Sequence, residues 1–134
     1  LPNRDYGPNL HPLQAVMSLN DIRTLRSKMD LMSRSTMRVS EWLQRHPLVE
    51  QVEYLGLPDH PLHALASKYL WLADAEHDDL YGKPVNRYGH LMSFCVKGGE
   101  ATTRKVFDGL ERIWRATDLG RIKSVATIPA ISPR

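Results

Sequence analysis

The sequence lacks the features that mark secreted and membrane proteins. It holds one cysteine, so no disulfide can form within the chain, and Cys95 sits in an apolar run that predicts a small buried side chain. No apolar run approaches the roughly 20 residues of a membrane helix. The first residues have no apolar core of the kind that signal peptides carry. We therefore expect a reducing, cytoplasmic setting and no membrane partner.

Neither sign of charge dominates the chain. The chain has 18 Lys and Arg residues and 15 Asp and Glu residues, which gives a formal charge of +3 and a pI of about 9.2. The basic residues are interspersed with acidic ones and form no cluster, so no nucleic-acid partner is expected. Hydrophobic residues make up 42% of the 134 positions, which suffices for the core of one folded domain.

The N-terminal third predicts a long helix after a short extended segment. Residues 1–12 are rich in Pro, Asn and Gly and read as a lead-in, with a single domain over residues 13–134. Asn20 and Asp21 offer a cap that would split the helix in two, and Pro47 ends it after His46. Apolar residues spaced by three and four define its expected buried face: Leu19, Ile22, Leu25, Met29, Met32, Thr36, Val39 and Leu43.

The remaining two thirds alternate between short strands and helices. Strands are predicted over residues 49–55, 91–96 and 122–128, and the second is apolar on both faces, as in a central strand covered on both sides. One helix is expected to start at Pro61 and another after Gly98 and Gly99. This order predicts an α+β fold with a small, mostly antiparallel sheet and helices packed on it.

Residue chemistry alone indicates no active site. His60 and His63, with His77 in the acidic segment 74–79, suggest metal ligands, but Pro61 separates the first pair and no cysteine joins them. We expect solvent-facing imidazoles and no metal. A phosphate site at Gly98-Gly99 is disfavoured by Glu100 in the first helical turn.

Several motifs, in order along nearly the whole chain, do match one family. Val52-Glu53-Tyr54-Leu55-Gly56-Leu57-Pro58-Asp59-His60-Pro61 is similar to the pattern V-x-Y-P-G-L-P-x-H-P, and Ser93-Phe94-Cys95-Val96-Lys97-Gly98-Gly99 to S-F-x-x-K-G-G. Val39-Ser40-Glu41-Trp42-Leu43, followed by His46-Pro47, is similar to its helix end. The chain thus resembles the C-terminal domain of the Cys/Met-metabolism, or transsulfuration, family of pyridoxal-phosphate (PLP) enzymes.

The resemblance implies a fold-type I enzyme, generally a homotetramer, in which a lysine of the larger domain holds PLP. Such enzymes act on small sulfur-linked amino acids by β- or γ-elimination or γ-replacement. No lysine of this chain stands in the family's S-x-T-K context, so we expect no catalytic, cofactor-binding or metal-binding residue here and an isolated chain that is inactive. The missing PLP-binding domain is then a partner. The lysines are Lys28, Lys68, Lys83, Lys97, Lys105 and Lys123.

One substrate site is implied by the same resemblance. The family's S-L-G loop holds the substrate α-carboxylate, and here it reads Thr117-Asp118-Leu119-Gly120. Asp118 replaces the usual serine, and its carboxylate repels a substrate carboxylate unless it pairs with Arg115 or Arg121. The segment that follows this loop in the family is not found, so we expect the domain to be cut short at its end.

Two functions from different classes remain open. In the first, the chain is part of a transsulfuration enzyme and shapes the substrate-carboxylate side of the cleft. In the second, it is a stand-alone, non-catalytic interaction or assembly module derived from that domain. Either way, the apolar face of the long helix predicts self-association of isolated chains.

Overall fold

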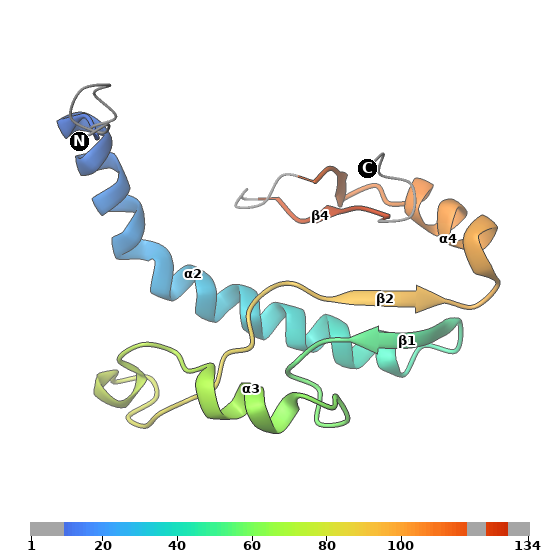
Figure 1. Cartoon of the computed structure of the whole chain (residues 1–134), viewed down its shortest axis with the longest axis horizontal. Helices are drawn as coiled ribbons and strands as arrows, with labels where there is room; N and C mark the ends of the chain where they lie inside the picture. Colours follow the sequence, from blue (N-terminus) through green and yellow to red (C-terminus); the bar gives the residue numbers. More distant parts are fainter. Residues whose placement is uncertain (1–9, 118–122, 129–134) are drawn as a thin grey trace, which may run out of the picture. The chain divides into compact units, whose positions relative to one another are not determined.

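The computed structural model describes residues 10–117 and 123–128 and has an α+β fold, as predicted (Figure 1). The domain boundary expected at residue 12 stays a prediction, although a helix already begins at Pro12. None of the helices in the described part of the chain is long and apolar enough to cross a membrane. The elements are α2 (Pro12–Gln44), β1 (Val49–Glu53), α3 (His63–Tyr69), the 3-10 helix η1 (Ala75–His77), β2 (Ser93–Val96), α4 (Gly99–Asp108), β3 (Trp114–Arg115) and β4 (Val125–Ala126).

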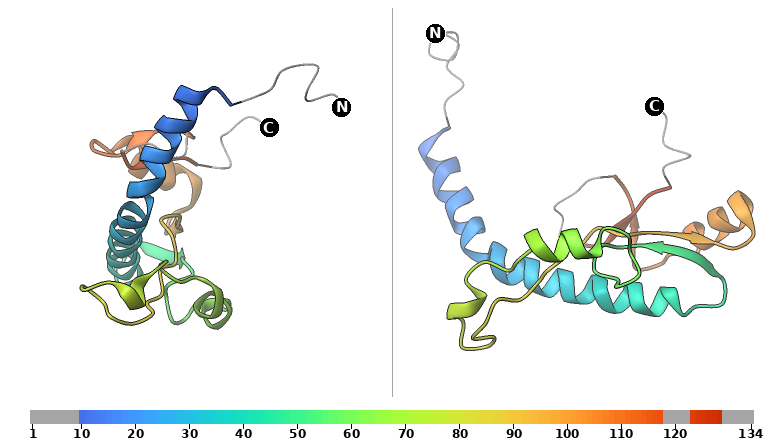
Figure 2. Two further views of the ribbon diagram at one scale, coloured as in Figure 1. Left: turned by 90° about the vertical axis from the view of Figure 1, so that its left-hand side faces the viewer. Right: turned by 60° about the horizontal axis from the view of Figure 1, so that its bottom comes forward.

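The chain forms two compact units. The first unit contains Leu1–Trp42 and Glu53–Ser93, and the second contains Leu43–Val52 and Phe94–Arg134. In the first unit, α3 and the loop around η1 lie along the C-terminal half of α2 (Figures 1 and 2).

Helix α2 runs unbroken through Asn20 and Asp21, so the predicted split is wrong. A cap residue ends a helix only where the following amides lose their helical acceptors. Here Asn20 and Asp21 are exposed, and Thr24 donates its hydroxyl back to the Asp21 carbonyl at 3.0 Å within the continuous helix. Proline suits the first turn of a helix, because it has no N–H to satisfy there, and α2 does start at Pro12.

The face of α2 that packs in the first unit is polar, which corrects the predicted apolar face. Asp30, Ser33 and Ser40 are 8%, 3% and 0% exposed. In the predicted stripe, Leu19 and Ile22 remain 52% and 62% exposed, whereas Leu43 at its C-terminal end is buried at 7%, as predicted. The stripe exists in the sequence, but the segments that fold onto α2 bring hydrogen-bonding groups to a different face.

Strand β2 is not the covered central strand that its composition predicts. It pairs with β1 alone in a two-stranded sheet, and Phe94 is 41% exposed. Cys95 is also exposed, not buried. A strand is buried on both faces only when layers cover both, and the described residues supply no such layers. The predicted strand at 122–128 shortens to β4, and the predicted helix start at Pro61 moves to His63.

The two strand pairs differ in direction. The arrows of β1 and β2 point in opposite directions in Figure 1. β3 and β4 pair in parallel, with Trp114 opposite Val125 and Arg115 opposite Ala126. An isolated antiparallel bridge also joins Trp71 to Asn86, so among the described pairings only β3 with β4 is parallel.

The tripeptide His-Pro-Leu occurs three times and makes the same local bond each time. The leucine N–H donates to the histidine Nδ1 two residues earlier: Leu13 to His11 at 3.2 Å, Leu48 to His46 at 3.2 Å, and Leu62 to His60 at 3.1 Å. Proline has no N–H, so the leucine amide is the first one free to bond. The imidazole thus imitates the side-chain acceptor of an Asx turn.

Candidate functional site

The predicted carboxylate-binding loop begins where β3 ends. The Trp114 N–H donates to the Ser124 carbonyl at 3.0 Å and the Ala116 N–H to the Ala126 carbonyl at 3.2 Å. These bonds tie together the two chain segments that flank the loop. Thr117 is exposed. Asp118, Leu119 and Gly120 lie outside the described residues, so the role of this loop stays a prediction.

Basic side chains stand on both sides of this loop. Arg115 donates from Nη1 to Asp108 Oδ1 at 2.7 Å, so one of the two expected partners of Asp118 already has a carboxylate. The Lys123 Nζ lies 4.0 Å from the centre of the Trp114 ring, within cation–π range.

All six lysines are exposed in this chain. The Lys97 ammonium donates to the Pro47 carbonyl at 2.8 Å, and Lys68 Nζ lies 5.3 Å from the centre of the Tyr69 ring. A lysine that forms a covalent bond to a cofactor is activated by desolvation or by a neighbouring cation. Every lysine lies in the described part of the chain, and none is buried there.

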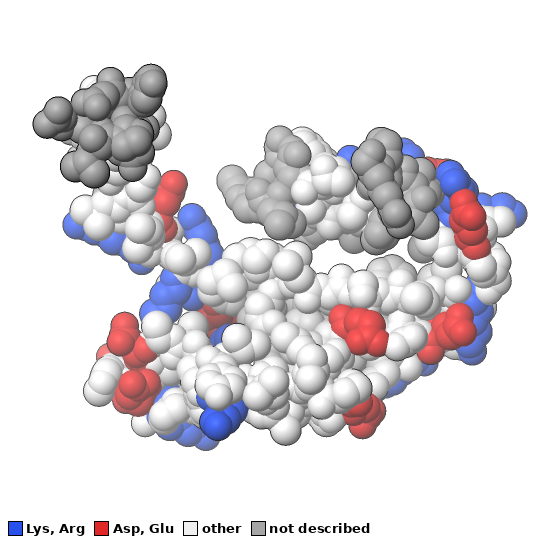
Figure 3. All heavy atoms as spheres, in the orientation of Figure 1, with Lys and Arg blue, Asp and Glu red and all other residues white. Residues whose placement is uncertain are grey.

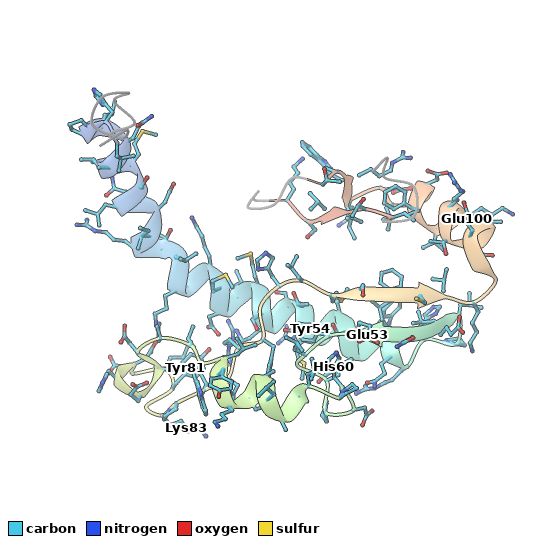
Figure 4. All side chains as sticks on the ribbon, viewed as in Figure 1. Glu53, Tyr54, His60, Tyr81, Lys83 and Glu100 are labelled. Carbon is cyan, nitrogen blue, oxygen red and sulfur yellow. The ribbon has the colours of Figure 1, made fainter. Side chains whose placement is uncertain are left out.

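The prediction of solvent-facing histidines holds for one of the three side chains. His77 is solvent-facing, with a side chain 79% exposed. His60 and His63 are instead partly buried, because the turn that holds them folds back on itself. His60 Nε2 lies 3.0 Å from Glu53 Oε2 (Figure 4). His63 Nδ1 hydrogen-bonds the Leu55 carbonyl at 2.8 Å. Among the described residues no group of three or more side chains is placed to hold a metal ion.

Tyr54 is the centre of the motif at residues 52–61. It is 2% exposed, and its hydroxyl donates to the Gly89 carbonyl at 2.9 Å (Figure 4). Ser33 Oγ of α2 lies 3.5 Å from the same hydroxyl. Burial raises the pKa of Tyr54 above its ordinary 10.0. A Cβ at Gly56 would come within 2.5 Å of the Tyr54 ring, so the glycine leaves space for the tyrosine. The motif therefore has a packing role in this chain.

A buried carboxylate, missed by sequence reasoning, joins α2 to the loop before β2. Asp30 accepts hydrogen bonds from Arg87 Nε at 2.5 Å and from the Tyr81 hydroxyl at 2.7 Å. Burial by itself would raise the pKa of Asp30, but these two bonds and the charges of Arg87 and Arg34 outweigh it and hold the pKa below 3.8. We call Asp30, Tyr81 and Arg87 the Asp30 cluster.

A second ion pair holds the same loop to α2, but here the arginine is on the helix and the aspartate is in the loop. Arg26 of α2 donates from Nη2 to Asp78 Oδ2 and from Nε to the Ala73 carbonyl, both at 2.6 Å. The Leu80 N–H and Arg26 both bond the Asp78 carboxylate and lower its pKa. Residues 73–87 are thus held to α2 at two points, each with an arginine and an aspartate.

An open cleft of about 450 Å³ lies beside the Asp30 cluster in the first unit. Its charged residues are Arg34, Arg38 and Glu41 of α2 together with Arg87. On the face drawn in Figure 3, acidic and basic side chains are interspersed.

The family described as Cys/Met metabolism PLP-dependent enzyme matches residues 1–133. An O-succinylhomoserine sulfhydrylase from Pseudomonas aeruginosa is 34% identical over 127 residues, which cover 95% of this chain and 28% of the relative. An L-methionine gamma-lyase from Pseudomonas deceptionensis is 34% identical over 124 residues, covering 92% and 27%.

Solved structures agree. A cystathionine gamma synthase from Xanthomonas oryzae pv. oryzae, in complex with aminoacrylate and cysteine, superposes with a TM-score of 0.70 at 32% identity, covering 90% of this chain and 27% of that one. An O-acetylhomoserine (thiol)-lyase from Campylobacter jejuni gives a TM-score of 0.74 at 28% identity, covering 96% and 28%. The chain spans about a quarter of the length of the relatives it matches.

Proposed function

Because this chain belongs to the Cys/Met metabolism PLP-dependent enzyme family, we propose that it forms the C-terminal, substrate-side region of an enzyme acting on sulfur-linked amino acids. The reaction class is β- or γ-elimination or γ-replacement. The supporting observation is the likeness of almost the whole chain to enzymes about four times its length. When bound, PLP supplies an electron sink for substrate carbanions in such enzymes.

The cofactor and its lysine belong, in this proposal, to the rest of the enzyme. The exposure of all six lysines supports this division. So does the apolar stripe of α2, where Leu19, Ile22 and Leu25 are each 50% exposed or more. Apolar stripes of this kind are normally buried against another layer. The proposed partners are the PLP-binding domain and further copies of the enzyme. These copies would form a homotetramer in the cytoplasm.

The loop Thr117-Asp118-Leu119-Gly120 is the proposed contact with the substrate α-carboxylate. Backbone N–H groups and the Thr117 hydroxyl would donate to the carboxylate, and the cations Arg115 and Lys123 would add attraction. Asp118 would oppose binding through like-charge repulsion. Asp118→Ser should therefore strengthen substrate binding.

A chimera tests this role. The matching region of the Pseudomonas aeruginosa O-succinylhomoserine sulfhydrylase is replaced by residues 1–133, PLP loading is checked by absorbance, and kcat/KM is measured. We expect PLP-dependent turnover, and Asp118→Ser should raise kcat/KM roughly tenfold, the effect of removing about 1.4 kcal/mol of repulsion. A folded, PLP-loaded chimera without turnover would contradict the proposed function. An unchanged kcat/KM in the Asp118 variant would contradict only the role of the loop.

The isolated chain tests whether the cofactor lysine lies in the rest of the enzyme. After the chain is mixed with PLP and dialysed, we expect no retained absorbance near ~420 nm. Borohydride reduction of the dialysed chain should then leave no cofactor mass on it. A stoichiometric pyridoxyl adduct on one lysine would show that this region holds the cofactor itself.

A further inference from the structure

The cleft beside the Asp30 cluster carries two charged groups of opposite sign that the first unit leaves unused. Arg38 and Glu41 both line it, three residues apart on α2. Side chains at this spacing are neighbours on a helix surface, yet no ion pair joins them. Neither makes a hydrogen bond or ion pair with any other residue in the part of the chain that the structure describes. Arg34, one turn before Arg38, reaches Asp30 only at 3.6 Å.

The inner polar groups of the cleft are already engaged. Arg87 bonds Asp30, Tyr81 and the Asn86 carbonyl. The Asn86 side-chain amide donates to the Ser67 and Leu70 carbonyls at 2.7 and 2.9 Å. A ligand would therefore find its charged partners on α2, and its apolar contacts on the partly exposed Met37 and Tyr88.

We propose that this cleft binds a zwitterionic α-amino acid with an apolar side chain. The carboxylate would lie on the Arg38 guanidinium, flanked by Arg34, and the ammonium on Glu41. A simple anion would face the Glu41 carboxylate, and a simple cation would face the arginines, so only a ligand with both charges has a partner for each. The volume of about 450 Å³ is within the range of small-molecule sites.

This site shares no residue with the loop Thr117–Gly120, and it does not rest on the proposed function. A ligand at the cleft would bridge two turns of α2 and contact the segment 86–88, so it would strengthen the hold of that segment on the helix.

Three matched ligands test the proposal on the unmodified chain. L-norleucine carries both charges, hexanoate lacks the ammonium and hexylamine lacks the carboxylate. In amide NMR titrations up to about 10 mM, norleucine should saturate shifts of residues 33–41 and 86–88, and each half-ligand should bind at least roughly tenfold more weakly. Absent shifts in these residues, or hexanoate binding as tightly as norleucine, would overturn the proposal. This comparison does not depend on any variant folding.

Single substitutions test the separate roles of the Arg38 and Glu41 charges. Arg38→Gln and Glu41→Gln should each weaken norleucine binding roughly fivefold or more, while Glu41→Gln should improve hexanoate binding. Arg104→Gln in α4 is the matched control and should leave affinity unchanged, because Arg104 pairs with Glu100 on another helix. Norleucine binding that is lost with Thr117→Val but retained with Arg38→Gln would place the ligand at the loop and refute the cleft site.

Discussion

Arg87 donates its Nε hydrogen to the carboxylate of Asp30, which lies 57 residues earlier in the chain and is 8% exposed. Removing both charges from water costs free energy. The Tyr81 hydroxyl helps to offset this cost, because it donates to Asp30 and accepts from Arg87. The arrangement joins α2 to the loop before β2, beside the apolar core of the first unit, where Leu72 and Ala75 are 5% and 0% exposed.

Asp30→Asn should destabilise the first unit by about 3 kcal/mol, because it leaves the partly buried Arg87 guanidinium without its anion. Urea unfolding followed by tryptophan fluorescence measures the loss. Asp79→Asn, which alters an exposed carboxylate of the same loop, is the control and should change stability by less than about 0.5 kcal/mol. If Asp30→Asn lost no more stability than Asp79→Asn, the Asp30 cluster would not stabilise the fold.

Stability should fall in acid. The pKa values of Asp30 and Asp78 are both lowered in the fold, so their contribution is complete above the ordinary value of 3.8 and is lost as pH falls from there through the folded pKa values. Unfolding free energies measured between about pH 3 and pH 7 should be flat in the upper part and drop below about pH 4. Asp30→Asn should flatten that drop, and an unaltered acid profile in the variant would contradict the assignment.

Tyr54→Phe should cost about 1–2 kcal/mol, because it leaves the Gly89 carbonyl without the donor of a 2.9 Å hydrogen bond in a buried site. Tyr69→Phe removes a hydroxyl from a side chain that is 65% exposed and should have no measurable effect. Thermal unfolding of both variants makes the comparison. A loss as large in the Tyr69 variant would point to a general effect of the substitution.

Gly56→Ala should destabilise by about 1–3 kcal/mol through overpacking, since the new Cβ would lie 2.5 Å from the Tyr54 ring and 3.1 Å from Met37 Sδ. At Gly109 the nearest atoms are 3.4 Å away and φ is −80°, so Gly109→Ala should be neutral or slightly stabilising. Chemical denaturation of the two variants is the test. Should Gly56→Ala fold as stably as the parent, the close packing around Tyr54 would be disproved.

His60→Asn should retain more stability than His60→Ala. Asparagine offers an acceptor to the Leu62 N–H, which the histidine now satisfies at 3.1 Å, whereas alanine offers none. Both variants lose the contact with Glu53, so their difference, expected to be about 1 kcal/mol, isolates the turn. His77→Ala, at an exposed histidine, is the control. Identical stabilities of the two His60 variants would mean that the turn needs no side-chain acceptor.

Local chemistry predicts much of the element order. Proline at positions 12 and 47 marks where α2 can begin and must have ended, because its ring suits a first helical turn and restricts the residue before it. The spacing of motif residues such as Tyr54 and Gly56 predicts the family, and Gly56 has a packing reason that its neighbours explain. These inferences succeed because each depends on residues within a few positions of one another.

Which face of α2 packs, by contrast, was decided by contacts made across the chain. Helical periodicity identifies Leu19, Ile22 and Leu25 as a stripe, but it does not say what meets the stripe, and in this chain it stays exposed. Asp30 reads as a solvated charge until Tyr81 and Arg87, 51 and 57 residues away, fold against it. A sequence pattern records the preference of each side chain for water or for an apolar setting; the partner that satisfies a buried charge is chosen only when distant segments meet.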